Sequence, residues 1–100
     1  MTMSVIELAT ISIVDGAESK FETAAAQAVP LFRTASGCRS MCLKRSVETG
    51  SYVLLVGWDS IEAHVAFRQT DGFAKWRALV GSLFAAPPIV EHLETIVEGF

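Results

Sequence analysis

Residues 52–58, YVLLVGW, decide the fold, because this stretch reads as a strand with apolar side chains on both of its sides. Successive side chains of a strand point to opposite faces. One face therefore carries Tyr52, Leu54, Val56 and Trp58, and the other carries Val53 and Leu55. A strand covered on one side only would alternate apolar and polar residues. The pattern predicts that both faces of the sheet containing this strand are covered.

The segments on either side of this strand predict a β-α-β-β-α-β order. Thr49-Gly50-Ser51 reads as a tight turn, so we expect residues 38–48 and 52–58 to form a hairpin. The remaining expected elements are strands at 4–14 and 89–97 and helices at 17–35, 61–69 and 72–84. This order is the ferredoxin-like α+β topology with an antiparallel sheet. A chain of 100 residues allows one domain, spanning 1–100.

Individual residues indicate where the helices begin and end. Pro30 lacks a backbone N–H, so we expect it to kink or interrupt the last turns of helix 17–35. Asp59 or Ser60 is expected to cap the short helix that follows the hairpin, and Asp71 the helix after it.

Composition and strand pattern together predict a homodimer joined through sheet faces. The chain is 51% hydrophobic and only 19% charged, whereas an ordinary domain has about 25% charged residues. In this topology the helices cover one sheet face, yet Ile6 and Leu8 of the first strand join Val53 and Leu55 on the other face. A second copy would cover that face. The alternative is a monomer with a partly apolar exposed surface.

Charge and hydropathy exclude several classes of partner. The net charge of −3 disfavours nucleic acid, which requires a basic stripe. No stretch reaches the ~18 apolar residues of a membrane helix, and the first residues lack the basic region of a signal peptide. We therefore expect a cytoplasmic protein.

Cys38 and Cys42 would lie about 13 Å apart on one strand, too far for a disulfide, and are expected to be small buried residues.

His64 is the strongest candidate for a catalytic residue. An imidazole next to an apolar pocket could accept a phenolic proton at neutral pH, although a histidine that only fixes its helix remains open. The pocket between sheet and helices would be lined by Tyr52, Trp58, Phe67, Phe73 and Trp76, which suits a flat aromatic ligand.

Arg77 could anchor an anionic or phenolate oxygen, or simply face solvent. His92 is expected to be structural, with a hydrogen bond across the dimer as one possibility. No metal-ligand spacing occurs, so no metal is predicted.

Two stretches carry a resemblance to a known family. They are YVLLVGWDSIEAHVAFRQTDGFAKW, residues 52–76, and PPIVEHLETI, residues 87–96. The strand ending in Trp58, the Ala63-His64 pair, Phe73 and the run Pro88 to His92 resemble the antibiotic biosynthesis monooxygenase domain family. The resemblance implies a dimeric α+β barrel. Members of that family oxygenate quinol-type polyketides, cleave haem, process signalling molecules or have no assigned activity.

The resemblance argues against haem cleavage. Haem-degrading members place a ligating histidine at the position of Arg77, and they carry an asparagine in the first strand, whereas residues 4–14 contain none. What the resemblance favours is a cofactor-independent monooxygenase acting on a small electron-rich aromatic of the quinol or anthrone type. A non-catalytic binding or interaction module on the same barrel is the alternative, as is an isomerase or degradative enzyme for a small oxygenated metabolite.

Overall fold

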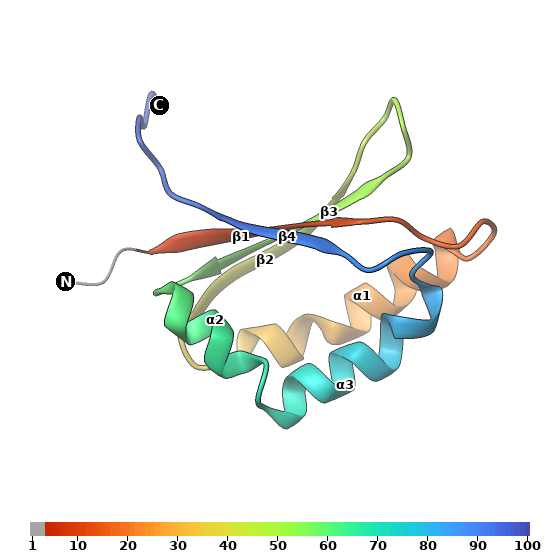
Figure 1. Ribbon diagram of the computed structural model, residues 1–100, viewed down its shortest axis with the longest axis horizontal. Coiled ribbons are helices and arrows are strands. Elements are labelled where there is room, and N and C mark those ends of the chain that lie inside the picture. Colours follow the sequence, from red (N-terminus) through yellow and green to blue (C-terminus); the bar gives the residue numbers. More distant parts are fainter. Residues whose placement is uncertain (1–3) are drawn as a thin grey trace.

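A computed structural model describes residues 4–100 and shows one antiparallel four-stranded sheet with helices on one side (Figure 1). The elements are β1 (Val5–Ile11), α1 (Glu18–Arg33), β2 (Cys38–Arg45), β3 (Tyr52–Trp58), α2 (Ile61–Phe67), α3 (Asp71–Val80), the short 3-10 turn η1 (Gly81–Leu83) and β4 (Ile89–Leu93). The strand order is β2-β3-β1-β4. Both the predicted element order and the ferredoxin-like α+β class are confirmed.

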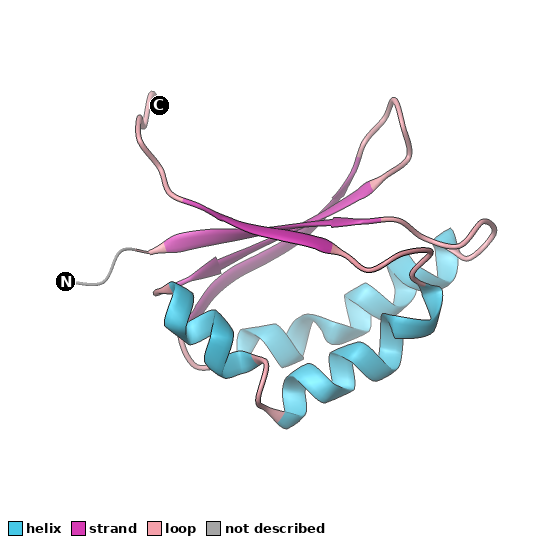
Figure 2. Cartoon of the chain, viewed as in Figure 1, coloured by secondary structure: helices cyan, strands magenta, loops and turns pink. Residues whose placement is uncertain are grey.

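The core lies between the sheet and the three helices (Figure 2). Alternate residues of β3 point into it, and Val56 and Trp58 are fully buried. Helix α1 contributes Phe21, Ala28 and Phe32, and its alanines allow the helix to lie close to the sheet. The predicted inward face of β3 is therefore the helix-covered face.

Pro30 does not interrupt α1, so of the two expected outcomes the interruption is wrong and the kink stays a prediction. The helix continues to Arg33, and the Pro30 carbonyl accepts hydrogen bonds from the backbone N–H and the hydroxyl of Thr34. Pro30 removes one backbone hydrogen bond, and the hydrogen bonds that Thr34 donates to its carbonyl continue the helix past it.

Several element ends also differ from expectation. Ser60 caps α2 through its side chain, as one of the two proposed residues, but Thr70 rather than Asp71 caps α3. Strand β2 ends at Arg45, and β4 ends at Leu93. The end of β4 coincides with the end of its pairing, because β1 pairs with β4 only as far as Ile6 opposite Leu93.

The sheet face opposite the helices is largely apolar, with Thr10, Ser40, Lys44 and Glu91 among its residues, and is uncovered within residues 4–100. In the register it carries Ile6, Leu8, Cys42, Val53, Leu55, Ile89 and Leu93. We call these residues the open face. The expectation that both cysteines are buried is wrong for this chain alone, because Cys42 is exposed on the open face and Cys38 is only partly covered.

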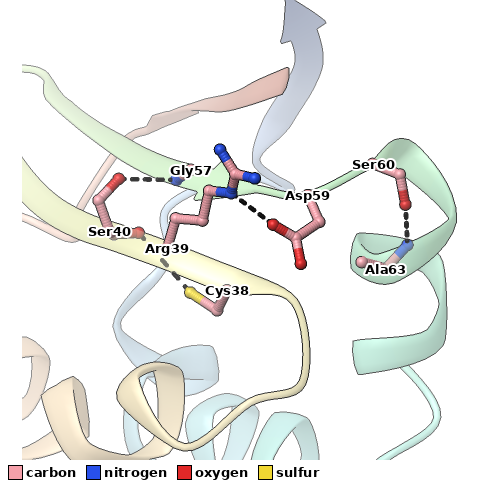
Figure 3. Close-up of polar contacts among 7 residues, drawn as sticks. All are labelled: Cys38, Arg39, Ser40, Gly57, Asp59, Ser60 and Ala63. Atoms are coloured by element: carbon pink, nitrogen blue, oxygen red, sulfur yellow. Dashed lines mark hydrogen bonds and ion pairs between the residues drawn. The ribbon is translucent and has the colours of Figure 1, made fainter. Parts of the chain in front are cut away.

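A β-bulge at the start of β2 joins the sheet to the segment that leads into α2. The register shifts between Cys38 and Ser40, and the Ser40 hydroxyl accepts a hydrogen bond from the Gly57 N–H at 3.1 Å (Figure 3). Next to it, Arg39 forms an ion pair with Asp59 (Figure 3). These contacts fix the end of β3, from which the chain enters α2.

Candidate functional site

A glutamate lies inside the core on β1. Glu7 shares the inward face of its strand with Val5 and Ala9, and its residue is only 7% exposed. A buried carboxylate requires hydrogen-bond partners. Trp58 supplies one, since its indole Nε1–H donates to Glu7 Oε1 at 3.0 Å.

His64 lies against the same carboxylate and is 3% exposed. Its ring stacks on the indole of Trp58, with centroids 5.2 Å apart and planes at 15°. Its Nε2 is 3.2 Å from Glu7 Oε1, and its Nδ1 is 2.8 Å from His92 Nε2 on β4. Both ring nitrogens therefore lie next to a polar group, Nδ1 in a hydrogen bond and Nε2 in a close contact. We call Glu7, Trp58, His64 and His92 the polar cluster.

The first turn of α2 positions this histidine. Ser60 Oγ accepts a hydrogen bond from the Ala63 N–H at 3.1 Å (Figure 3). The Asp59 N–H donates to the Gly37 carbonyl at 2.8 Å, which ties the helix entry to the start of β2. A Cβ on Gly37 would lie 2.7 Å from the Ala63 Cβ, and its φ is +79°, so both space and conformation require glycine there.

Burial sets the protonation of the polar cluster. It lowers the pKa of His64 from 6.5 to about 4, with smaller contributions from the charges of Arg68 and His92. It also raises the pKa of Glu7, against the opposing effects of the Trp58 hydrogen bond and Arg68. At pH 7 His64 is neutral. In the tautomer with its proton on Nε2, His64 turns an N–H toward Glu7 Oε1, and its Nδ1 accepts from His92 Nε2–H.

A cavity of about 330 Å³ opens beside Glu7 and His64. Its walls are Ala9, Ile11, Leu54, Phe73, Trp76, Phe84, Pro87, Pro88 and Val90, and Arg68 and Arg77 complete the lining. Neither arginine forms an ion pair with another residue of 4–100. The cavity therefore combines apolar walls, a buried carboxylate–imidazole pair and two guanidinium groups.

Four of the predicted site residues line this cavity, namely His64, Phe73, Trp76 and Arg77. Trp58 does not line the cavity. It stacks on His64 and donates a hydrogen bond to Glu7, and these two residues do line it. Phe67 packs in the core against Phe32, Trp58 and Phe73. Tyr52 lies at the other end of β3, where its hydroxyl donates to Glu22 at 2.5 Å. It does not line the cavity.

Sequence reasoning missed Glu7, Arg68 and the partner of His92. The available signal for Glu7 was an ionisable residue at an inward position of an apolar strand, between Val5 and Ala9. His92 contacts His64 of its own chain through Nε2, and a hydrogen bond from His92 across a dimer stays a prediction.

Among the described residues, 4–100, no group of three or more His, Cys, Asp or Glu side chains could hold a metal ion. The helices in that part of the chain are also too short or too polar to cross a membrane.

Comparison with known proteins adds sequence and fold relationships. The family model described as antibiotic biosynthesis monooxygenase matches residues 4–79. The uncharacterized protein YczJ of Bacillus subtilis (strain 168) is 34% identical over 92 residues, covering 90% of this chain and 97% of YczJ.

Solved structures show the same fold. A crystal structure from Bordetella bronchiseptica, described as a candidate antibiotic biosynthesis monooxygenase, is 42% identical with a TM-score of 0.92, covering 96% of this chain and 100% of that chain. The structure of SnoaB from Streptomyces nogalater, a cofactor-independent oxygenase, has a TM-score of 0.81 at 19% identity and covers 95% of each chain. At that identity the likeness to SnoaB concerns the fold alone.

Proposed function

This chain belongs to the antibiotic biosynthesis monooxygenase family, and from that premise we propose that it is a cofactor-independent monooxygenase of a small, electron-rich aromatic of the quinol or anthrone type. One observation carries the proposal. The cavity of about 330 Å³ has aromatic and aliphatic walls and places a buried Glu7–His64 pair beside the space for a ligand. Flat phenolic rings match such walls, and the pair supplies a base.

The proposed chemistry needs only a base, dioxygen and the substrate's own electrons. The Glu7–His64 pair removes a proton from an anthrone-type methylene, and the resulting carbanion reduces dioxygen and forms a C–O bond. The peroxide then loses its second C–H proton while its O–O bond breaks, which leaves a carbonyl and water. Overall, a methylene group and a molecule of dioxygen give a carbonyl group and a molecule of water, and the methylene carbon supplies all of the electrons. The apolar walls keep bulk water from the anion.

Arg68 and Arg77 would hold the oxygen that carries the delocalised negative charge. Both line the cavity, and a guanidinium presents a planar set of donors to an oxyanion. Deprotonation of an anthrone or quinol places negative charge on the ring oxygen. Stabilising that charge lowers the barrier to proton removal.

Oxygen consumption tests the proposed function. We expect uptake of dioxygen with at least one member of a panel of hydroquinones and anthrones, and we expect Val90→Trp, which fills the cavity, to reduce it at least about tenfold. Val65→Trp on the exposed side of α2 is the matched control, because Val65 does not line the cavity. Saturable binding without uptake would favour a non-catalytic binding module. Conversion without oxygen consumption would favour an isomerase.

We also propose that a second copy of the chain covers the open face. Its residues are apolar, and Lys44 and Glu91 lie on the same face at the opposite edges formed by β2 and β4. A two-fold axis lying between the two packed faces and parallel to the strands would place the β2 edge of one copy over the β4 edge of the other, and so bring Lys44 near Glu91. Such self-complementarity is what an isologous interface requires.

Sedimentation at micromolar concentration tests the assembly. We expect a dimer, with an interface of at least about 1,200 Å², and we expect Leu55→Asp to dissociate it because an unpaired buried charge is costly. Val47→Asp is the control, since Val47 is 90% exposed and lies off the open face in the turn after β2. A monomeric wild-type protein would contradict the proposal.

A further inference from the structure

We propose that Glu7, rather than His64, is the group that receives the substrate's proton, and that His64 and His92 are positioning residues that hold its carboxylate. This inference rests on the proposed function, because it assigns roles within that site. It is carried by the contacts of the individual nitrogen and oxygen atoms.

Both nitrogens of His64 already lie against polar atoms of the protein. Its Nε2 is 3.2 Å from Glu7 Oε1, and its Nδ1 is 2.8 Å from His92 Nε2. The stack on Trp58 covers one face of the ring and holds its orientation. A base must lie within hydrogen-bond reach of the proton that it takes, and His64 would have to break one of its two contacts to do so.

Glu7 has an oxygen to spare. Its Oε1 receives the Trp58 N–H and faces His64 Nε2, whereas Oε2 has no hydrogen-bond partner within residues 4–100. No buried side-chain oxygen in that range is without a partner. Oε2 is therefore accessible, and the open space next to Glu7 is the cavity. The carboxylate is fixed by one oxygen and presents the other to a ligand.

The charged and titratable neighbours of Glu7 suit a base. Arg68 follows α2 directly, His64 lies on that helix, and His92 lies on β4 opposite Glu7 in the register. Burial raises the pKa of Glu7, which strengthens it as a proton acceptor, while the Trp58 N–H on Oε1 and the charge of Arg68 oppose that rise.

The proton balance closes on Glu7 alone. Oε2 takes the first C–H proton and returns it to the peroxide anion, which leaves the carboxylate ionised again. It then takes the second C–H proton as the O–O bond breaks, and returns that proton to the departing hydroxide to form water. No proton needs to pass through His64, whose Nδ1 is held by His92.

Hydrogen–deuterium exchange without oxygen isolates this step. Anthrone is incubated anaerobically in deuterated water with the protein, and incorporation of deuterium at the methylene is followed by mass spectrometry. We expect the wild type to accelerate exchange and Glu7→Gln to lower that acceleration by about 10²–10⁴. Glu22→Gln is the matched control, because Glu22 also accepts a hydrogen bond from a buried aromatic side chain but lies outside the cavity.

His64→Phe separates positioning from proton transfer. Phenylalanine keeps the ring on Trp58 but removes the imidazole nitrogen that lies 3.2 Å from Glu7 Oε1, so we expect a loss of about tenfold and an acid limb of the pH–rate profile that moves to higher pH. If His64 is the base, the order reverses: His64→Phe then loses about 10²–10⁴ and Glu7→Gln loses little. That reversal overturns the proposal.

A second variant guards against misfolding of Glu7→Gln. Glu7→Ala leaves room at Oε2, and we expect formate, but not imidazole, to restore exchange. Absence of exchange in the wild type, or failure of formate to restore it in folded Glu7→Ala, also overturns the assignment. Exchange that depends on Glu7 without any oxygen uptake would instead support Glu7 as the base and reject the monooxygenase.

Discussion

Each end of β3 carries a buried aromatic side chain that donates a hydrogen bond to a glutamate, but the surroundings of the two glutamates differ. At one end the buried Trp58 donates its N–H to Glu7, and at the other the buried Tyr52 donates its O–H to Glu22. Glu7 extends from the central strand β1 into the core and meets a neutral His64. Glu22 extends from α1 into solvent and meets Arg45 at 3.4 Å, with both side chains about half exposed.

The difference between the two ends lies in what surrounds the carboxylate. Water can solvate Glu22 whatever its partners do, so its pairing with Tyr52 closes the edge of the core and little else follows. Glu7 has only the polar cluster and the cavity around it. Burial therefore turns an ordinary aromatic–carboxylate hydrogen bond into a group with an altered pKa beside a ligand-sized space.

The largest expected contrast is in stability after removal of the aromatic donor. Trp58→Phe should lower the free energy of unfolding by about 2–4 kcal/mol, because it leaves a void in a fully buried site and removes a partner of a buried carboxylate. Tyr52→Phe should cost about 0.5–1.5 kcal/mol, since Glu22 then turns to water. Urea unfolding at pH 7 measures both variants. Equal losses of unfolding free energy in the two variants would contradict this prediction.

The next prediction concerns how the free energy of unfolding depends on pH. The pKa of His64 is about 4 in the folded chain and 6.5 unfolded, so its lowered value destabilises the folded chain increasingly as the pH falls from 6.5 to 4. The size of this effect is roughly 3 kcal/mol. Glu7 acts with the opposite sign, because its raised pKa favours the protonated form in the folded chain, and the net slope is therefore smaller.

Nuclear magnetic resonance separates these two contributions. The imidazole nitrogens of His64 should remain neutral on titration down to about pH 5, one unit above its lowered pKa. Glu22→Gln should leave this titration unchanged, because Glu22 lies at the other end of β3. A His64 that titrates near 6.5 in the folded protein would contradict the burial argument.

Much of the fold could be predicted from patterns within single elements. The alternation in residues 52–58 predicted both the strand and its buried face, and the turn at Thr49-Gly50-Ser51 predicted the hairpin that β2 and β3 form. These patterns depend on neighbours a few residues apart. The interruption expected at Pro30 was wrong because the sequence does not show which later residues continue the helix past a proline, as Thr34 does here.

The residues of the candidate site could be predicted only in part, because the sequence shows which residues share a face but not which of them line one cavity. Aromatic residues on one strand face and on the next helices predicted an apolar pocket, and Phe73 and Trp76 do line it. Tyr52 shares that face with Trp58 but lies at the opposite end of β3, away from the cavity. Sharing a face is a local property, whereas lining one cavity depends on how three helices cross the sheet.

The sequence by itself determined the element order, the inward face of β3 and the surplus of apolar residues on the other face, because each follows from spacing along one strand or helix. Only the tertiary structure decided that Glu7 and His64, far apart in the chain, lie within hydrogen-bonding distance, and that His92 contacts His64 from the far edge strand. These contacts arise from antiparallel register and from the packing of α2 on the sheet. Burial then shifts pKa values in ways that residue type alone does not contain, because the shift depends on exclusion of water by segments distant in the chain.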